Sequence, residues 1–281
     1  MDNILTSNDL SDINNYNDDI NINVSILFLK YVGIIHNLIS SIVENINVKD
    51  LEYLKYILIK GIKNTTYIYT FLLLYTKNIN LTVYHTERNI LYYVEFIGQI
   101  NLETNNFLKL SINDASLFIY KRTIFDIDCE FRKNYIETPK TKNIIDLLHQ
   151  YINIYNNILI MYINTFDFYT FTTGDLQKNI FTKLYKISER LIQIPSFCKN
   201  TNISEHEAIK KITVMVSEID KFHHCKIIKN NYFIVVNYII KKFLSKPINI
   251  DGFINKINGD HFEERIKNMS ITRMVNYLTL H

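Results

Sequence analysis

Apolar residues recur at steps of three and four along most of the chain, which is the spacing of one face of an α-helix. The clearest example lies in residues 139–165. There the apolar positions are Ile144, Leu147, Leu148, Tyr151, Tyr155, Ile158, Met161 and Tyr162, and Asn and Gln side chains lie opposite. Thr138 and Pro139 are residue types that begin helices. The pattern predicts an amphipathic helix roughly 40 Å long.

The same spacing predicts helices over residues 24–46, 48–60, 66–77, 81–100, 113–127, 175–193 and 205–223, with short ones near 252–257 and 262–278. Ser204 and Glu207 have the spacing of a capping box at the start of one of them. Gly61 is expected to end the helix over 48–60. Residues 227–244 fit either a helix or a buried strand, and residues 100–110 fit a small β-hairpin.

Composition supports a helical fold. The chain has 281 residues but only 6 Gly and 3 Pro, whereas average usage would give roughly 20 and 14. Folds with many tight turns draw on Gly and Pro, so their scarcity favours long helices. We therefore predict an all-α protein, an irregular bundle of about eight to ten helices.

Three segments are expected along the chain. Residues 1–20 carry five Asp and no basic residue, which predicts a disordered acidic N-terminal segment. Residues 21–195 are expected to form the core of the helical bundle. A polar link over 196–203 would then lead into a C-terminal helical subdomain, residues 196–281, that packs on the core.

The cysteines and the N-terminus favour a reducing compartment. Cys129, Cys198 and Cys225 are far apart and odd in number, so they offer no disulfide framework. The acidic N-terminus is the reverse of a signal peptide. Residues 147–166 are the most apolar candidate for a membrane span, but they contain His149, Gln150 and four Asn. We predict a cytoplasmic protein without a membrane span.

One polar seam lies on the predicted helix over residues 81–100. His85, Arg88, Tyr92, Glu95 and Gln99 are spaced 3, 4, 3 and 4, which places them along one side of the helix. The seam fits a solvated face, a ladder of hydrogen bonds between helices, or a surface that binds a partner. A catalytic use, with His85 as acid or base, would require the seam to line a pocket.

Two more charged residues extend this interpretation. Asp114 and Lys121 lie two turns apart on the predicted helix over 113–127, and they could pair with Arg88 and Glu95 across a helix–helix contact. Ion pairs of this kind specify register more often than they perform chemistry. We include Asp114 and Lys121 with the seam as candidate interaction residues.

Nucleic-acid binding is the alternative. The net charge of the chain is only +3, but residues 201–281 contain 12 Lys and Arg against 8 Asp and Glu. The candidate contacts are the pairs Lys210–Lys211 and Lys241–Lys242. The glycine-rich motifs that bind nucleotide phosphates are missing from the sequence.

Metal-ligating residue types occur near the C-terminus but do not converge. His223, His224 and Cys225 are adjacent, and neighbouring residues point about 100° apart on a helix. His206 is expected at the other end of the same helix. Neither a metal nor a cofactor is expected.

Residues 72–100 and 110–127 resemble an uncharacterised protein family of giant DNA viruses of the mimivirus kind. The strings that carry the resemblance are LLLYTKNINLTVYHTERNILYYVEFIGQI and LSINDASLFIYKRTIFDI. That family has no assigned activity, so the resemblance implies no catalytic residues. It implies a viral source, replication in the host cytoplasm and packaging in the virion. Together these features favour a non-enzymatic helical interaction or structural protein with a protein partner.

Overall fold

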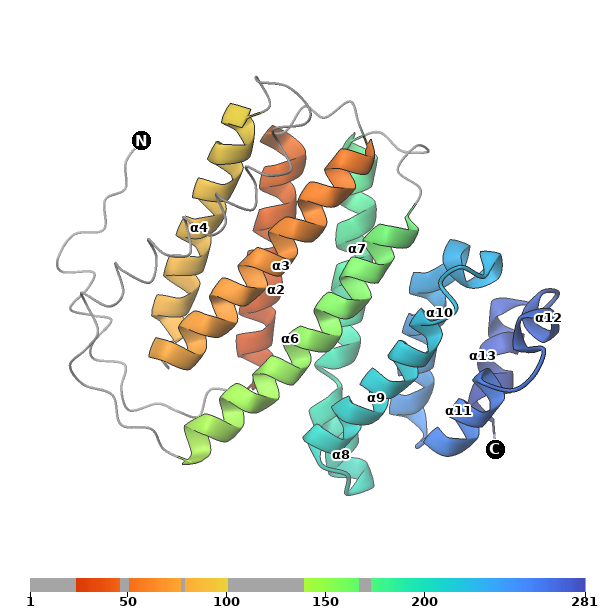
Figure 1. Ribbon diagram of the computed structural model, residues 1–281. Helices are drawn as coiled ribbons and strands as arrows, with labels where there is room; N and C mark the ends of the chain where they lie inside the picture. The colour runs from red at the N-terminus through yellow and green to blue at the C-terminus, as the bar shows by residue number, and fades with distance from the viewer. Residues whose placement is uncertain (1–23, 46–50, 77–78, 101–138, 167–172, 281) are drawn as a thin grey trace. The chain divides into compact units, whose positions relative to one another are not determined.

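In the computed structural model, residues 24–45, 51–76, 79–100, 139–166 and 173–280 are described (Figure 1). No strand occurs in these residues, which confirms the prediction of an all-α protein. The possible hairpin near 100–110, the helix over 113–127 and the acidic segment 1–20 lie outside them. The helices are α2 (Val24–Asn45), α3 (Leu51–Thr76), α4 (Ile79–Ile100), α6 (Pro139–Thr165), α7 (Thr173–Leu191), α8 (Ile194–Thr201), α9 (Glu205–Asp220), α10 (Lys226–Ser245), α11 (Ile250–Ile257), α12 (Phe262–Ile266) and α13 (Ile271–Thr279).

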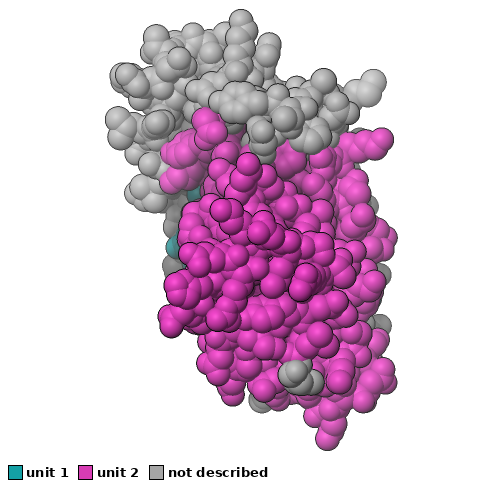
Figure 2. Space-filling view, turned by 90° about the vertical axis from the view of Figure 1, so that its right-hand side faces the viewer, with its two compact units in different colours: residues 1–34, 64–148 teal, residues 35–63, 149–281 magenta. Residues whose placement is uncertain are grey.

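The chain divides into two compact units. Unit 1 comprises residues 1–34 and 64–148, and unit 2 comprises residues 35–63 and 149–281. Helices α2, α3 and α6 each contribute residues to both. Figure 2 shows the surface of unit 2 in magenta. The expected division at residue 196 stays a prediction.

Unit 1 is organised around aromatic residues of α2 and α3. Tyr31 and Tyr69 are fully buried, and their ring centroids lie 4.9 Å apart. The Tyr31 hydroxyl forms a 2.8 Å hydrogen bond with the Thr66 hydroxyl. Ile68 and Leu72 add an apolar cluster one turn along α3. For Tyr31, the ring is therefore buried while the hydroxyl finds a partner.

Unit 2 is organised around α10, which packs against α7, α8, α9 and α13. The buried face of α10 carries Tyr232, Val236, Ile239 and Phe243 at helical spacing. This settles residues 227–244 as helix rather than strand. The backbone of α10 leaves helical geometry at Asn231, where φ is −128° and ψ is 16°. The Asn231 side chain donates a hydrogen bond to the Ile227 carbonyl across this kink.

The predicted helix starts are confirmed where local sequence decides them. The Ser204 hydroxyl accepts a hydrogen bond from the Glu207 amide at the start of α9, as the capping box requires. Helix α6 begins at Pro139, which tolerates that position because it lacks an amide hydrogen.

Two predicted breaks are wrong. Helix α3 runs without interruption through Gly61, because Ile57, Leu58 and Ile62 are buried around it and their packing offsets the cost of about 1 kcal/mol that a glycine adds to a helix. The expected polar link over 196–203 is largely helix α8, whose Phe197 and Cys198 are buried. Pro195 lies in the first turn of α8, so it begins a helix there.

Candidate functional site

The structure separates the first two residues of the predicted seam on α4. His85 is buried, with 5% of its surface exposed, whereas Arg88 lies on the exposed side of the helix. The two side chains therefore do not share one environment. Tyr92, Glu95 and Gln99 belong to α4, but their side chains lie outside the described part of the structure, as do the whole of Asp114 and Lys121.

The buried polar residues of α4 form a different set, namely Thr82, His85, Thr86 and Asn89. The Thr86 hydroxyl donates to the Thr82 carbonyl at 2.6 Å, and the Asn89 amide donates to the His85 carbonyl at 3.0 Å. Bonds to the carbonyl four residues earlier are the usual way for such side chains to be buried within a helix. The sequence did not predict this face, because the 3-4-3-4 spacing picks out larger polar and charged residues and leaves out Thr82, Thr86 and Asn89.

The four candidate lysines lie on the α9–α10 pair. Lys210 is exposed on α9, and the Lys211 ammonium lies 2.6 Å from the Glu207 carboxylate. Lys241 and Lys242 are both exposed near the end of α10. The first turn of α9 is acidic, with Glu205 and Glu207, so the basic character of this region comes from α10.

Helix α10 presents a continuous exposed stripe, which we call the α10 stripe. It consists of Asn230, Ile234, Tyr238, Lys241 and Lys242, spaced 4, 4, 3 and 1. Ile234 and Tyr238 are 41% and 37% exposed, so two large apolar side chains one turn apart face solvent on this stripe. The sequence of α10 also contains Lys226 and Lys229 but no acidic residue.

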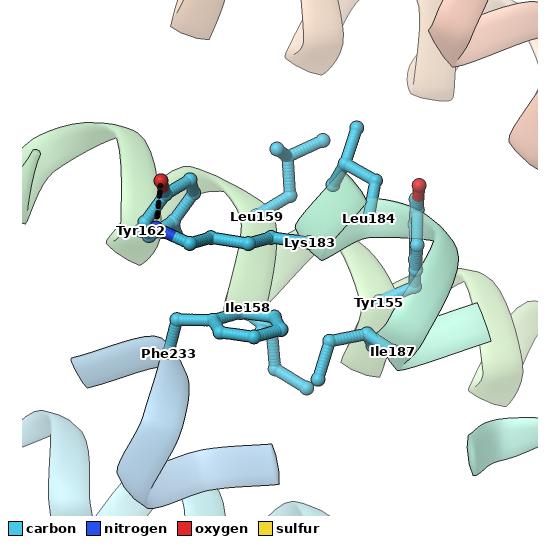
Figure 3. Close-up of a pocket in the computed structure, with 8 residues that line it drawn as sticks. All are labelled: Tyr155, Ile158, Leu159, Tyr162, Lys183, Leu184, Ile187 and Phe233. Carbon is cyan, nitrogen blue, oxygen red and sulfur yellow. Dashed lines mark hydrogen bonds between the residues drawn. The ribbon is translucent and has the colours of Figure 1, made fainter. Parts of the chain in front are cut away.

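A second feature is an aromatic pocket around Lys183 of α7 (Figure 3). The Lys183 ammonium donates a 2.9 Å hydrogen bond to the Tyr162 hydroxyl of α6. It lies 4.8 Å from the centroid of the Tyr162 ring and 5.8 Å from the centroids of Phe166 and Phe233. Tyr162 and Phe166 lie one turn apart at the end of α6, and Phe233 comes from α10. Sequence periodicity predicted that Tyr162 is in the core but did not identify Lys183 as its neighbour.

A third cluster surrounds the turn between α9 and α10. The fully buried Tyr232 donates a 2.7 Å hydrogen bond to the Asp220 carboxylate. Burial raises the pKa of Asp220 to about 6, although the Tyr232 hydrogen bond and the charge of His223 act in the opposite direction. His224 Nε2 lies 2.7 Å from a Glu263 carboxylate oxygen of α12.

His206 and His224 of unit 2 lie in separate surroundings. His206 Nδ1 forms a 2.8 Å hydrogen bond with the Gln150 amide, far along the chain from the His224–Glu263 pair. In the described part of the chain, no group of three or more His, Cys, Asp or Glu side chains is placed to hold a metal ion.

Helix α2 is the one helix of the described residues that is long and apolar enough to cross a membrane. Half of the apolar window within its residues 24–44 is buried inside the protein. The sequence had pointed to residues 147–166 instead.

No protein-family model matches the sequence, and no curated protein or solved structure shows significant similarity to it.

Proposed function

We propose that this protein is a non-enzymatic helical interaction protein that binds a protein partner through the α10 stripe. The observation that carries the proposal is the exposed pair Ile234 and Tyr238, followed on the same side of the helix by Lys241 and Lys242. Aromatic residues are enriched where proteins contact one another, and exposed apolar side chains that adjoin charged ones are typical of such surfaces.

The chemistry of the stripe favours an acidic amphipathic segment as the partner. Ile234 and Tyr238 would contact its apolar side, while Lys241 and Lys242 would pair with its carboxylates. The stripe spans 13 residues from Asn230 to Lys242, and the 12 steps between them correspond to about 18 Å of helix. This length corresponds to about three turns of a partner helix.

Nucleic-acid binding through Lys210, Lys211, Lys241 and Lys242 is the second candidate. Helix α10 favours it, because this helix has four exposed lysines and no acidic residue. However, Lys211 is paired with Glu207, and Glu205 lies in the same turn. A protein partner uses the apolar part of the stripe as well as its charge, so we place it first.

Photo-crosslinking tests the proposal directly. Benzoylphenylalanine is introduced at Tyr238, and the protein is expressed in its native or infected cells. We expect one dominant protein crosslink, which is lost when Lys241→Glu and Lys242→Glu are added. Tyr185 of α7 is a matched control because it is an aromatic residue that is 62% exposed in the same unit. Equal crosslinking from positions 185 and 238, or crosslinking to nucleic acid at position 238, would reject the proposal.

The resemblance of residues 72–100 and 110–127 extends the proposal to a viral source. In that case the protein acts in the host cytoplasm or in the virion. Arg88, Tyr92, Glu95 and Gln99 of the seam, with Asp114 and Lys121 but without the buried His85, remain a second set of candidate interaction residues in this setting. Mass spectrometry of purified virions and of infected-cell cytoplasm tests the location, and absence from both would reject it.

A further inference from the structure

Helix α4, yellow in Figure 1, has a buried side and an exposed side. Its exposed side chains in the described part of the chain are Asn80, Tyr84, Glu87, Arg88 and Leu91. Because successive residues of a helix are about 100° apart, these five all lie within an arc of about 100° around the axis. We call them the α4 face. The buried polar residues of α4 lie on the other side of the helix.

Two large apolar side chains of the α4 face lie on either side of its charges. Tyr84 is 40% exposed, and Leu91 is 66% exposed, which is the highest value among the large hydrophobic residues of the described chain. The two are seven residues apart, the spacing that keeps side chains directed at a neighbouring helix. Apolar side chains that share a face and are bordered by polar residues mark an interaction surface.

The order of these residues along α4 is self-complementary. Tyr84 and Leu91 are equally far from the midpoint between Glu87 and Arg88. If a second α4 packs antiparallel with its centre at this midpoint, Tyr84 lies opposite Leu91 of the second copy, and Glu87 lies opposite its Arg88. Two-fold symmetry repeats each pair, so the arrangement contains two apolar contacts and two ion pairs. In a parallel pair each charge would lie opposite its own kind, and repulsion would oppose that arrangement.

This property distinguishes the α4 face from the α10 stripe. The charged residues of the α10 stripe are both lysines, Lys241 and Lys242, so the stripe offers no ion pair to a second copy of itself. The α4 face carries one carboxylate and one guanidinium side by side, which match each other in the reversed direction. Charge complementarity therefore favours a second copy of this chain as the partner of the α4 face.

We propose that the protein forms a dimer in which two α4 faces pack antiparallel about a two-fold axis between residues 87 and 88. The contact is short, because the stretch from Tyr84 to Leu91 spans about 10 Å of helix, whereas a standard interface buries roughly 800 Å² on each partner. We therefore expect a weak, reversible dimer with a dissociation constant of roughly 10–100 µM. This inference is independent of the α10 stripe and of the function proposed for it.

Sedimentation velocity of the full-length chain tests the proposal. Measurements from about 5 to 500 µM bracket the expected dissociation constant, and the average sedimentation coefficient should rise from that of a monomer toward that of a dimer. Glu87→Arg and Arg88→Glu each place like charges opposite one another at both ion pairs. Each substitution alone should therefore raise the dissociation constant about tenfold or more.

A mixture of the two variants separates pairing across the two-fold axis from a general effect of charge. A copy with Glu87→Arg and a copy with Arg88→Glu present opposite charges to each other at both pairs. Their equimolar mixture should dimerise about as well as the parent, although neither variant does so alone. The double variant should recover the dimer for the same reason, and circular dichroism checks that each variant keeps its helices.

Leu91→Ala tests the apolar contacts and should weaken the dimer. Tyr185→Ala is the matched control, because Tyr185 of α7 is 62% exposed and lies outside the α4 face. The proposal would be overturned by a parent that stays monomeric up to about 500 µM, well above the expected dissociation constant. It would also be overturned by a dimer that both charge variants leave intact, or by a mixture that stays monomeric. Loss of the dimer on Ile234→Ala and not on Leu91→Ala would assign the contact to the α10 stripe instead.

Discussion

Asp220 shows how one buried side chain can set the pH dependence of stability. The folded protein holds its proton with a pKa of about 6, against an ordinary value of 3.8. Between these values the folded state binds more protons than the unfolded chain, so the free energy of unfolding falls as the pH rises from about 4 to 6. Above pH 6 the charged carboxylate remains buried, and its cost is fully present.

We therefore expect Asp220→Asn to stabilise the protein at neutral pH. Asparagine keeps the shape and an oxygen that accepts the Tyr232 hydrogen bond, but it carries no charge to desolvate. The expected gain at pH 7.5 is about 1–2 kcal/mol, after allowance for the partial exposure of Asp220. Urea unfolding at pH 4.5 and 7.5 measures this gain. In the variant, the free energy of unfolding should change less between pH 4 and 6 than it does in the parent protein.

Asp260→Asn is the control, because Asp260 is an exposed carboxylate in a turn of the same unit. The Asp260→Asn variant should show the same pH dependence of the free energy of unfolding as the parent protein. Destabilisation of the Asp220→Asn variant at pH 7.5 would contradict the account, because it would show that the charged carboxylate contributes more through its hydrogen bond than it loses by burial.

Gly33 is a second residue whose substitution should change the free energy of unfolding. It lies inside α2 on an exposed side, and an added Cβ atom would meet no atom within 4 Å. Glycine costs a helix roughly 0.5–1 kcal/mol relative to alanine because the unfolded chain has more freedom to lose. Gly33→Ala should raise the free energy of unfolding by about this amount in thermal or urea unfolding.

Gly252→Ala provides the contrast for this experiment. There the added Cβ would lie 3.3 Å from the side-chain nitrogen of Asn249, which caps α11 through the Gly252 amide. The tight contact disturbs the cap, so the gain should be absent. Equal gains at both glycines would show that contacts in the folded state do not matter at either position.

At the level of single helices, α9 is stabilised by a side-chain cap at its N-terminus. The Ser204 hydroxyl accepts a 3.2 Å hydrogen bond from the Glu207 amide, one of the amides that a helix start leaves without a backbone partner. Ser204→Ala should therefore lower the free energy of unfolding by about 1 kcal/mol in urea titration. Ser217→Ala is the matched control, since Ser217 is exposed inside α9 and its hydroxyl donates only to the Val214 carbonyl. It should be neutral or slightly stabilising, and an equal loss at both serines would refute a capping role.

How much of each helix could be predicted from sequence depended on the range of the deciding interactions. The start of α9 is set by Ser204 and Glu207, which are neighbours in sequence, and it was predicted correctly. The continuity of α3 through Gly61 depends on the burial of residues around it, which no local pattern reveals. Helix α8 was missed for the same reason, because the burial of Phe197 and Cys198 outweighs the polar residues around them.

The candidate sites could likewise be predicted only where the residues that form them are close in sequence. The exposed lysines Lys241 and Lys242 could be identified from sequence, because they lie side by side on one helix. The pocket of Lys183 could not, since only the tertiary fold brings Tyr162 and Phe166, at the end of α6, together with Lys183 of α7 and Phe233 of α10. The α4 seam was placed on the right helix, but its spacing did not indicate that His85 is buried and Arg88 exposed.

At the scale of the whole molecule, the charge balance separates the two candidate functions. A net charge of +3 provides little long-range attraction for a polyanion, so any DNA contact must come from local lysines. Helix α10 offers four of them, Lys226, Lys229, Lys241 and Lys242. Each phosphate neutralised contributes about −0.9 to the slope of log affinity against log salt, so four lysines limit the slope to about −3.6.

We therefore expect duplex DNA to bind no tighter than about 10⁻⁶ M at physiological salt, the range of non-specific contacts. Fluorescence anisotropy with a labelled duplex across a series of salt concentrations measures this. Lys241→Glu with Lys242→Glu should reduce the magnitude of the slope by about 1.8, because two phosphate contacts are lost. Ile234→Ala should leave the slope unchanged while it weakens the protein crosslink from position 238. Nanomolar DNA binding with a slope steeper than about −4 would instead place nucleic-acid binding first, because α10 alone could not supply that many phosphate contacts.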